Sequence, residues 1–221
     1  MKDLQKVSIV IEGNDSTVRR IYMDGTEDSF LVQTHQPGEL FTNGSFKRCT
    51  QAFAVPKLPK GCIALNIVDE ANYETLIRIP GAKRVITYKS YANGDSTYSV
   101  PFPDMLFHFR VSKQQITRSK AWALNRKGDL CRFPYTNVHS GGSICWGSYT
   151  IPIIVELSDI DKAVELFYTS TFNNHLYGGK GTVAELFTSV QGKRVFPQRY
   201  LKKTSDGSLY DYCKQHGFTL L

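Results

Sequence analysis

The sequence predicts an α+β domain in which an antiparallel β-meander is flanked by helices. Two observations lead to this fold class. Short runs of β-branched and aromatic residues fill much of the first half of the chain, and Gly, Asn and Asp residues divide them. In the last third, apolar residues recur at the spacing of an α-helix instead. Strands joined by short turns pair antiparallel, which gives the meander.

The first strands are expected close to the N-terminus, followed by a short helix. Ser45 can cap this helix and Pro56 would end it. The strand runs are residues 7–11, 19–23 and 29–34, the turns are residues 13–15 and 24–25, and the helix is residues 45–54.

A connector rich in Pro and Gly, PKLPKGC, covers residues 56–62 and is the best place for a subdomain boundary. We therefore expect residues 1–62 to form a strand-rich N-terminal extension. The sequence leaves open whether this extension belongs to the same domain. Residues 63–221 are expected to form the main domain.

A second strand-rich block spans residues 75–123. Asn93-Gly94-Asp95 is a strong hairpin signal, because Asn and Gly tolerate the positive φ angles of a tight turn. Pro101-Phe102-Pro103 would interrupt the hydrogen-bond ladder. The expected strands are residues 84–91, 97–100, 105–111 and 119–124, with a further turn at residues 127–129.

The last third predicts helices. Ser158 or Asp159 can cap a helix that runs through Tyr168, with apolar residues at helical spacing. Two further helices are expected at residues 182–190 and 209–216.

Composition limits the compartment more than the function. The formal net charge of +7 favours an acidic partner, whether a protein surface, a nucleic acid or an anionic membrane face. The five cysteines are odd in number and scattered, without a Cys-x-x-Cys pair, which argues against a disulfide framework or a structural zinc site. The sequence shows no secretory leader pattern, and no run approaches the roughly 20 apolar residues of a membrane span. We expect a soluble protein without a membrane partner, in a reducing compartment where free thiols persist.

The segment at residues 132–148 lacks periodicity but is rich in aromatic and small residues, which is typical of a functional loop. It contains the parts that thioester chemistry needs, which are a thiol, an amide donor and a turn that brings the two together. Cys145 supplies the thiol and Asn137 the amide. Gly141 and Gly142 allow the tight turn between them.

The stretch from Tyr135 to Trp146, YTNVHSGGSICW, resembles the active-site signature of ubiquitin-conjugating enzymes. That signature is His-Pro-Asn, a short variable loop and Gly-x-Ile/Val-Cys-Leu. Tyr135 and Thr136 replace the His and Pro here. The closer resemblance is to a prokaryotic branch, the ubiquitin-conjugating-like protein B of PRTRC-type cassettes. The segments that carry it are Pro134–Val138, Gly142–Ser148, Val100–Pro103, Ala121–Leu124 and Phe167–Phe172.

The resemblance implies an α+β fold of the ubiquitin-conjugating type, with residues 63–221 as the catalytic domain and Cys145 and Asn137 as catalytic residues. Tyr135, His139 and His175 are the auxiliary candidates. The implied partners are a ubiquitin-like protein, a ThiF-like activating enzyme that consumes the ATP, a target protein still to be identified, and a deubiquitinase-like peptidase encoded nearby. No cofactor is expected on this chain. A bacterial cytoplasm is implied, and a role in antiphage defence follows by analogy alone.

Several alternatives stay open. Cys145 could be a small buried apolar residue, and Asn137 could simply brace the loop through an Asx turn. The chain could be an inactive adaptor of the same fold. It could also bind nucleic acid through the basic residues of 193–203, although a solvated basic face is favoured. The glycine-rich stretch at 178–182 lacks the spacing of a phosphate loop, and we reject a nucleotide site there. The other cysteines are expected to be packing residues. For Cys213, near the C-terminus, an accidental reactive thiol stays open as an alternative.

Overall fold

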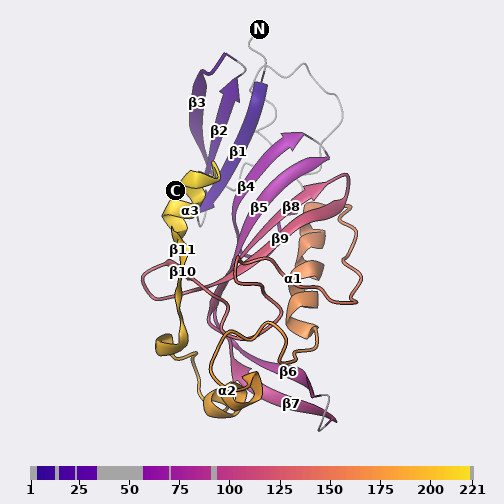
Figure 1. Ribbon diagram of the computed structural model, residues 1–221. Helices are drawn as coiled ribbons and strands as arrows, with labels where there is room; N and C mark the ends of the chain where they lie inside the picture. The colour runs from indigo at the N-terminus through magenta and orange to yellow at the C-terminus, as the bar shows by residue number, and fades with distance from the viewer. Residues whose placement is uncertain are drawn as a thin grey trace.

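The computed structural model describes residues 4–12, 15–22, 24–33, 57–69, 71–90 and 94–219. Its main feature is a nine-stranded antiparallel sheet with the strand order β11-β10-β9-β8-β5-β4-β1-β2-β3 (Figure 1). A separate hairpin, β6–β7, and three α-helices accompany this sheet in the described part of the chain. The predicted α+β class is confirmed.

The central strands are buried on both faces because side chains alternate between two apolar layers. Along β8, Met105 and Phe107 face one layer, and Leu106 faces the other. All three are fully buried. The central strands are β4 (Cys62–Asp69), β5 (Asn72–Ile79), β8 (Asp104–Ser112) and β9 (Gln115–Leu124).

The N-terminal strands extend this sheet. Strand β1 (Leu4–Glu12) pairs with β4 at Val7↔Ile67 and Ile9↔Leu65, and β2 (Asp15–Tyr22) and β3 (Glu27–Gln33) follow as a meander. The three predicted N-terminal strands are confirmed, although the division of the chain near residue 62 stays a prediction. The helix expected at residues 45–54 lies outside the described residues.

The predicted hairpin around Gly94 is also confirmed. Strands β6 (Lys83–Ser90) and β7 (Gly94–Pro101) pair with each other along their full length. The hairpin projects from the end of the main sheet where β5 leads out and β8 leads back in (Figure 1). Helix α2 (Val183–Val190) packs beside it.

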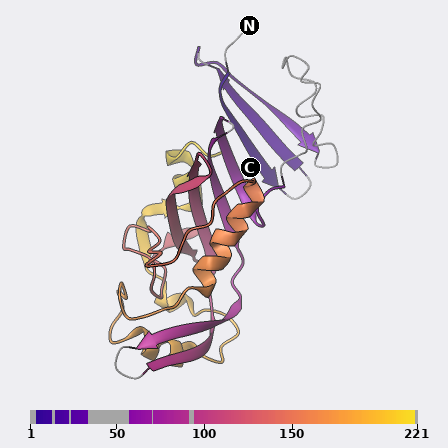
Figure 2. The same cartoon turned by 90° about the vertical axis from the view of Figure 1, so that its right-hand side faces the viewer.

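Helix α1 (Ile160–Thr169) lies across one face of the sheet, as Figure 2 shows. Its buried residues include Ile160, Ala163 and Phe167, which are spaced three and four apart. Helix α3 (Leu209–Gln215) begins at a Ser208–Asp211 capping box and covers the opposite face. The three helices predicted in the last third are confirmed. None of the described helices has both the length and the apolar character to cross a bilayer.

The core between α1 and the sheet is rich in aromatic rings. Phe102 makes edge-to-face contacts with Tyr135 and Tyr168, and Phe107 makes one with Phe167. Such pairs add to the stabilisation from burial alone. This aromatic layer connects the sheet, α1 and the segment that follows β10.

The opposite face is closed by α3 through a buried polar network. The side chain of His108 is fully buried, and its Nδ1 is hydrogen-bonded to the Tyr212 hydroxyl at 2.7 Å. Its Nε2 lies 2.9 Å from Glu74 Oε2, and Glu74 also pairs with Arg110. The ring of Trp122 contacts the Tyr212 ring at 4.7 Å between centroids.

Cys213 lies in the same layer and is 1% exposed. Burial raises the pKa of its thiol to about 12. The idea of a reactive thiol at Cys213 is therefore wrong, because the inward face of α3 holds this side chain in the interior.

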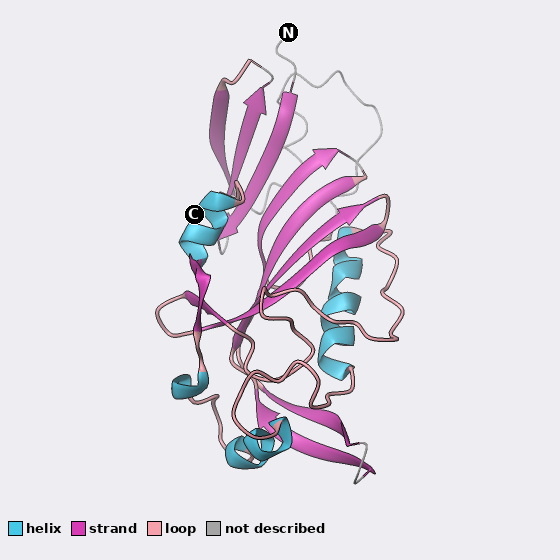
Figure 3. Cartoon of the chain, in the orientation of Figure 1, coloured by secondary structure: helices cyan, strands magenta, loops and turns pink. Residues whose placement is uncertain are grey.

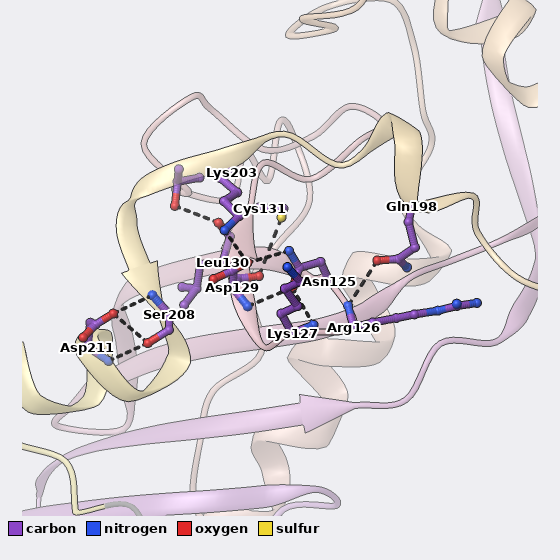
Figure 4. Close-up of polar contacts among 11 residues, drawn as sticks. Asn125, Arg126, Lys127, Asp129, Leu130, Cys131, Gln198, Lys203, Ser208 and Asp211 are labelled. Carbon is purple, nitrogen blue, oxygen red and sulfur yellow. Dashed lines mark hydrogen bonds and ion pairs between the residues drawn. The ribbon is translucent and has the colours of Figure 1, made fainter.

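One edge of the sheet is held by polar groups, as Figure 4 shows. Strands β10 (Asp129–Cys131) and β11 (Lys203–Ser208) are joined by an ion pair of 2.7 Å between Lys203 and Asp129. Asn125 organises the predicted turn before β10, because its Oδ1 accepts from the backbone N–H groups of Lys127 and Asp129. This edge runs to the start of α3.

Candidate active site

The irregular segment at residues 132–148 folds into a tight hairpin-like loop. Val138 pairs antiparallel with Ile144 through an isolated bridge. At the base of the loop, the backbone N–H of Cys145 donates to the carbonyl oxygen of Asn137 at 2.8 Å. The two residues expected to carry the chemistry are thus adjacent across the loop.

Strand β9 holds this loop in place. The backbone N–H of Ile144 donates to Ser119 O at 3.0 Å, and the N–H of Ala121 donates to Gly142 O at 2.8 Å. The loop therefore adds a short stretch of ladder to the sheet. Because its backbone is hydrogen-bonded on two sides, the position of Cys145 is fixed relative to the sheet.

The turn of the loop depends on Gly142. Its φ angle is 86°, and a Cβ atom there would lie 2.9 Å from the ring of Trp122. Any other residue would meet both backbone strain and a buried indole. Gly141 is exposed, and a Cβ atom at that position would have no neighbouring atom within 4 Å. Of the two loop-shaping glycines predicted, the geometry requires only Gly142.

Asn137 braces the loop against the end of α1. It has a φ angle of 68°, in the left-handed region that Asn tolerates better than most residues. Its Nδ2 donates to Ser170 Oγ at 3.1 Å and to Thr171 O at 3.2 Å. Ser170 Oγ in turn donates to Phe167 O at 2.8 Å. Both amide hydrogens of Asn137 are therefore engaged in holding two segments together.

Cys145 is partly exposed and lines a pocket of about 270 Å³. Asn137 and His175 line the same pocket, so the structure brings three of the predicted site residues together. The complete lining is Lys89, Asn137, Cys145, Trp146, Gly147, Ser148, Tyr149, Ser170, Thr171, Asn173, His175 and Leu176.

Tyr149 fastens the far wall of this pocket, which we call the cysteine pocket. Its hydroxyl accepts from the backbone N–H of Thr171 at 2.9 Å and is hydrogen-bonded to Thr171 Oγ1 at the same distance. The Tyr149 backbone N–H donates to Trp146 O at 3.0 Å, which closes a turn directly after Cys145. The chain on both sides of the thiol is thus tied to the segment that follows α1.

That segment also reaches the β6–β7 hairpin. The Phe172 N–H donates to Thr87 O at 2.8 Å, and the Lys89 N–H donates to Phe172 O at 2.7 Å. Lys89 is exposed and lines the cysteine pocket. Figure 3 shows these loops (pink) gathered between the main sheet and the hairpin.

The structure does not bring Tyr135 or His139 into the cysteine pocket. Tyr135 is 2% exposed, and its hydroxyl donates to Pro101 O at 2.6 Å. Burial raises its pKa far above the usual range. Its side chain is an anchor of the aromatic core. His139 is exposed and lines a neighbouring pocket.

Sequence reasoning missed the polar residues on the far side of the pocket. Tyr149 lies four residues after Cys145, whereas Lys89 and Thr171 come from distant segments. No periodic pattern in the sequence places these three residues at one site. The approach of Lys89 depends on the pairing of residue 172 with β6.

Other chemistry-bearing residues lie away from this pocket. Among the described residues, no group of three His, Cys, Asp or Glu side chains is placed to hold a metal ion. Cys131 is buried, and Cys62 contacts Thr75 through its sulfur. Phe196, the aromatic residue within the basic stretch at 193–203, is 4% exposed and belongs to the core.

Sheet, helices and loop together define a protein with the fold of the ubiquitin-conjugating enzymes. The sequence matches the family described as prokaryotic E2 family D over residues 45–204. The chain belongs to that family. No curated protein and no solved structure matches it.

Proposed function

We propose that this protein is a conjugating enzyme that carries a ubiquitin-like protein as a thioester on Cys145 and transfers it to an amine. One observation supports this above all others. Cys145 is partly exposed in a pocket, while its backbone is fixed by a hydrogen bond to Asn137 and by the ladder to β9. A nucleophile needs this combination of access and rigid placement.

In the first step, the Cys145 thiolate attacks the carbonyl carbon of a thioester on an activating enzyme. A C–S bond to Cys145 Sγ forms, and the thiolate of the activating enzyme leaves. We infer that this partner is a ThiF-like adenylating enzyme, which would use the ATP, so that this chain needs no cofactor of its own.

In the second step, an amine attacks the carbonyl carbon of the thioester on Cys145. A C–N bond forms, the C–S bond breaks, and Cys145 leaves as the thiolate. The proton released by the amine passes to water or to His175, which lines the same pocket. The role of Asn137 in this proposal is to hold the loop, because its amide hydrogens donate to Ser170 and Thr171.

The test is incubation with the activating enzyme and ubiquitin-like protein from neighbouring genes, together with ATP. An adduct that thiol reagents remove should appear on gels and map to Cys145. Cys145→Ser should abolish it or replace it with a thiol-resistant oxyester. A thiol-sensitive adduct that persists in Cys145→Ala would contradict the proposal.

A second candidate is an adaptor of the same fold that binds its partner without carrying a thioester. The amide of Asn137 favours it, because both of its hydrogens are engaged within the protein and neither is left to donate to an oxyanion. An adaptor would bind the same partners equally well with Cys145→Ser, and no adduct would form with either form of the protein.

A further inference from the structure

A second pocket of about 390 Å³ lies next to the cysteine pocket. Its lining carries the cationic side chains of Arg132, Lys180, Arg199 and Lys202, together with His139. No Asp or Glu is among the lining residues. We call it the basic pocket.

The two pockets are continuous along the chain. Leu176 lines both of them. In one segment, Asn137 lines the cysteine pocket and the next residue, Val138, lines the basic pocket. In the other segment, His175 lines the cysteine pocket and Tyr177 lines the basic pocket. Two segments therefore run as shared walls from one pocket into the other, and an extended peptide could occupy both.

The positive charge of the basic pocket is available to a ligand. Arg132 and Lys202 are held together by the Arg132 N–H, which donates to Lys202 O at 2.8 Å. Lys203, the next residue, is paired with Asp129, but within the described part of the chain Lys202 has no such ion pair. The same is true of Arg132, Lys180 and Arg199.

One of these cations is also positioned by a neighbouring group. Arg199 lies over the ring of Tyr200 at 5.0 Å and donates to its hydroxyl at 3.3 Å. One carboxylate, Glu185, lies beside this wall, next to Gly181 and close enough to act on Tyr177. Four cations against one nearby carboxylate leave the pocket positive, which favours an anionic ligand such as a carboxylate.

We propose that the basic pocket binds acidic side chains in the C-terminal tail of the ubiquitin-like protein, while the terminal carbonyl group of that tail reaches Cys145. The proposal rests on the function proposed above and adds a substrate class to it, a modifier whose tail is acidic shortly before its end. The carboxylates would gain from four cations at once, and a neutral or basic tail would not.

A nucleic acid is the other anionic polymer to consider, and the site fits it less well. Binding of single strands depends on exposed aromatic faces on which bases stack. Phe196 is buried, and the ring of Tyr200 is already covered by Arg199. Tyr177 carries the remaining partly exposed phenol ring among the lining residues, and one such ring cannot stack a run of successive bases. Single-stranded DNA therefore serves as a competitor in the test.

The first experiment measures binding by fluorescence anisotropy with two labelled hexapeptides, Glu-Asp-Glu-Leu-Gly-Gly and Gln-Asn-Gln-Leu-Gly-Gly. We expect the acidic peptide to bind at least about tenfold more tightly at low salt, as several close charge pairs together can provide. Arg132→Glu combined with Lys202→Glu should remove that preference and favour Lys-Lys-Lys-Leu-Gly-Gly instead. The matched control, Lys127→Glu with Lys214→Glu, changes the net charge equally outside both pockets and should bind like the wild type.

If the wild type binds the acidic peptide and the Gln-Asn-Gln peptide equally well, the proposal that the pocket selects an acidic tail is overturned. Single-stranded DNA that binds the wild type more tightly than the acidic peptide does, and that no longer binds the Arg132→Glu, Lys202→Glu variant, would also overturn the proposal. If the control variant loses the preference as well, the effect comes from net charge and the basic pocket is not the site.

The second experiment separates this proposal from the one on which it rests. The same peptides are supplied as C-terminal thioesters of mercaptoethanesulfonate, and mass spectrometry follows transfer to Cys145. Faster loading by the acidic peptide supports both proposals. Equal loading by both peptides keeps the thioester function and rejects the acidic preference. Absence of loading, with the binding preference intact, rejects the thioester function and leaves an acid-selective binding pocket.

Discussion

At the scale of single residues, the loop around Cys145 is held by one close contact and a few hydrogen bonds. Gly142 lies over Trp122, and Asn137 is joined to Ser170 and Thr171. These groups never have to touch a substrate to matter. They determine where the Cys145 sulfur is.

Gly142→Ala should destabilise the protein by about 1–3 kcal/mol, because it combines a positive φ angle with a contact on a buried ring. Urea denaturation measures the loss, and thioester formation should fall with it. Gly141→Ala is the matched control and should stay within about 0.5 kcal/mol of the wild type. Equal effects of the two substitutions would show that Trp122 does not constrain the turn.

Asn137→Gly allows the left-handed backbone and removes the side chain together with its amide. Because both amide hydrogens are engaged, we expect a loss of about 1–3 kcal/mol in the free energy of unfolding. Combined with Ser170→Ala, the losses should be less than additive, since the two residues share a hydrogen bond. A fall in transfer rate of about a hundredfold or more at unchanged stability would instead indicate a direct contact with the oxyanion.

At the scale of elements, the polar network that links the sheet to α3 through His108 and Tyr212 contains one carboxylate, Glu74. Burial alone would raise the pKa of Glu74, but the hydrogen bonds and charges of His108 and Arg110 outweigh burial and hold the pKa to about 2, below its usual 4.5. A lowered pKa in the folded state means that the group stabilises the protein above about pH 4.5. This contribution is lost as the pH falls from 4.5 towards 2.

The difference in unfolding free energy between wild type and Glu74→Gln should therefore be largest at neutral pH and shrink below pH 4.5. Urea titrations at a series of pH values measure it. Taking the difference removes the contribution of other carboxylates that titrate in the same range. A difference that is constant from neutral to acid pH would show that the Glu74–His108 contact does not depend on the charge of Glu74.

Some of these strands could be predicted from the sequence and others could not. The sequence Asn93-Gly94-Asp95 predicted the β6–β7 hairpin, because a few adjacent turn-forming residues are enough to indicate one. Strand β11, KTSDGS, has no alternation of apolar residues, so no hydrophobic pattern in the sequence predicts it. Polar groups such as the Lys203–Asp129 pair hold it in the sheet. Strand β4 begins at Cys62, where the Pro/Gly-rich connector was expected to end, and its run was not recognised as a strand.

The candidate site divides in the same way. Cys145, Asn137 and Gly142 belong to one short motif, and a local pattern is enough to find them. Lys89 reaches the pocket because Phe172 pairs with β6, and Tyr149 meets Thr171 there through hydrogen bonds to its hydroxyl. Such long-range pairing leaves no trace in the spacing of residues along the chain.

At the scale of the whole molecule, the strand pairs of the sheet differ in the length of their hydrogen-bonded ladders. Strands β5 and β8 pair in unbroken register from Asn72↔Ser112 to Ile79↔Met105, whereas β1 and β4 pair only from Val7↔Ile67 to Ile9↔Leu65. The β5–β8 pair is also covered by apolar layers on both faces. The N-terminal strands therefore depend on a much shorter ladder.

Hydrogen exchange should reflect this difference. We expect the amides of β5 and β8 to exchange most slowly, near the rate of global unfolding, and those of β1–β3 to exchange by an easier local opening. Mass spectrometry of peptic fragments measures both. Equal protection of the two regions would show that the extension and the main sheet unfold as one unit.

Trp122 has a consequence for anyone who shortens this chain. Its indole lies beneath Gly142, while its Nε1 donates to Asp206 at 2.9 Å and its ring contacts Tyr212. The family match ends at residue 204, before both of these partners. A fragment trimmed to that match would keep the residues that line the cysteine pocket. It would lose Asp206 and Tyr212, which position the indole beneath Gly142. Expression boundaries for this protein should therefore be drawn beyond α3.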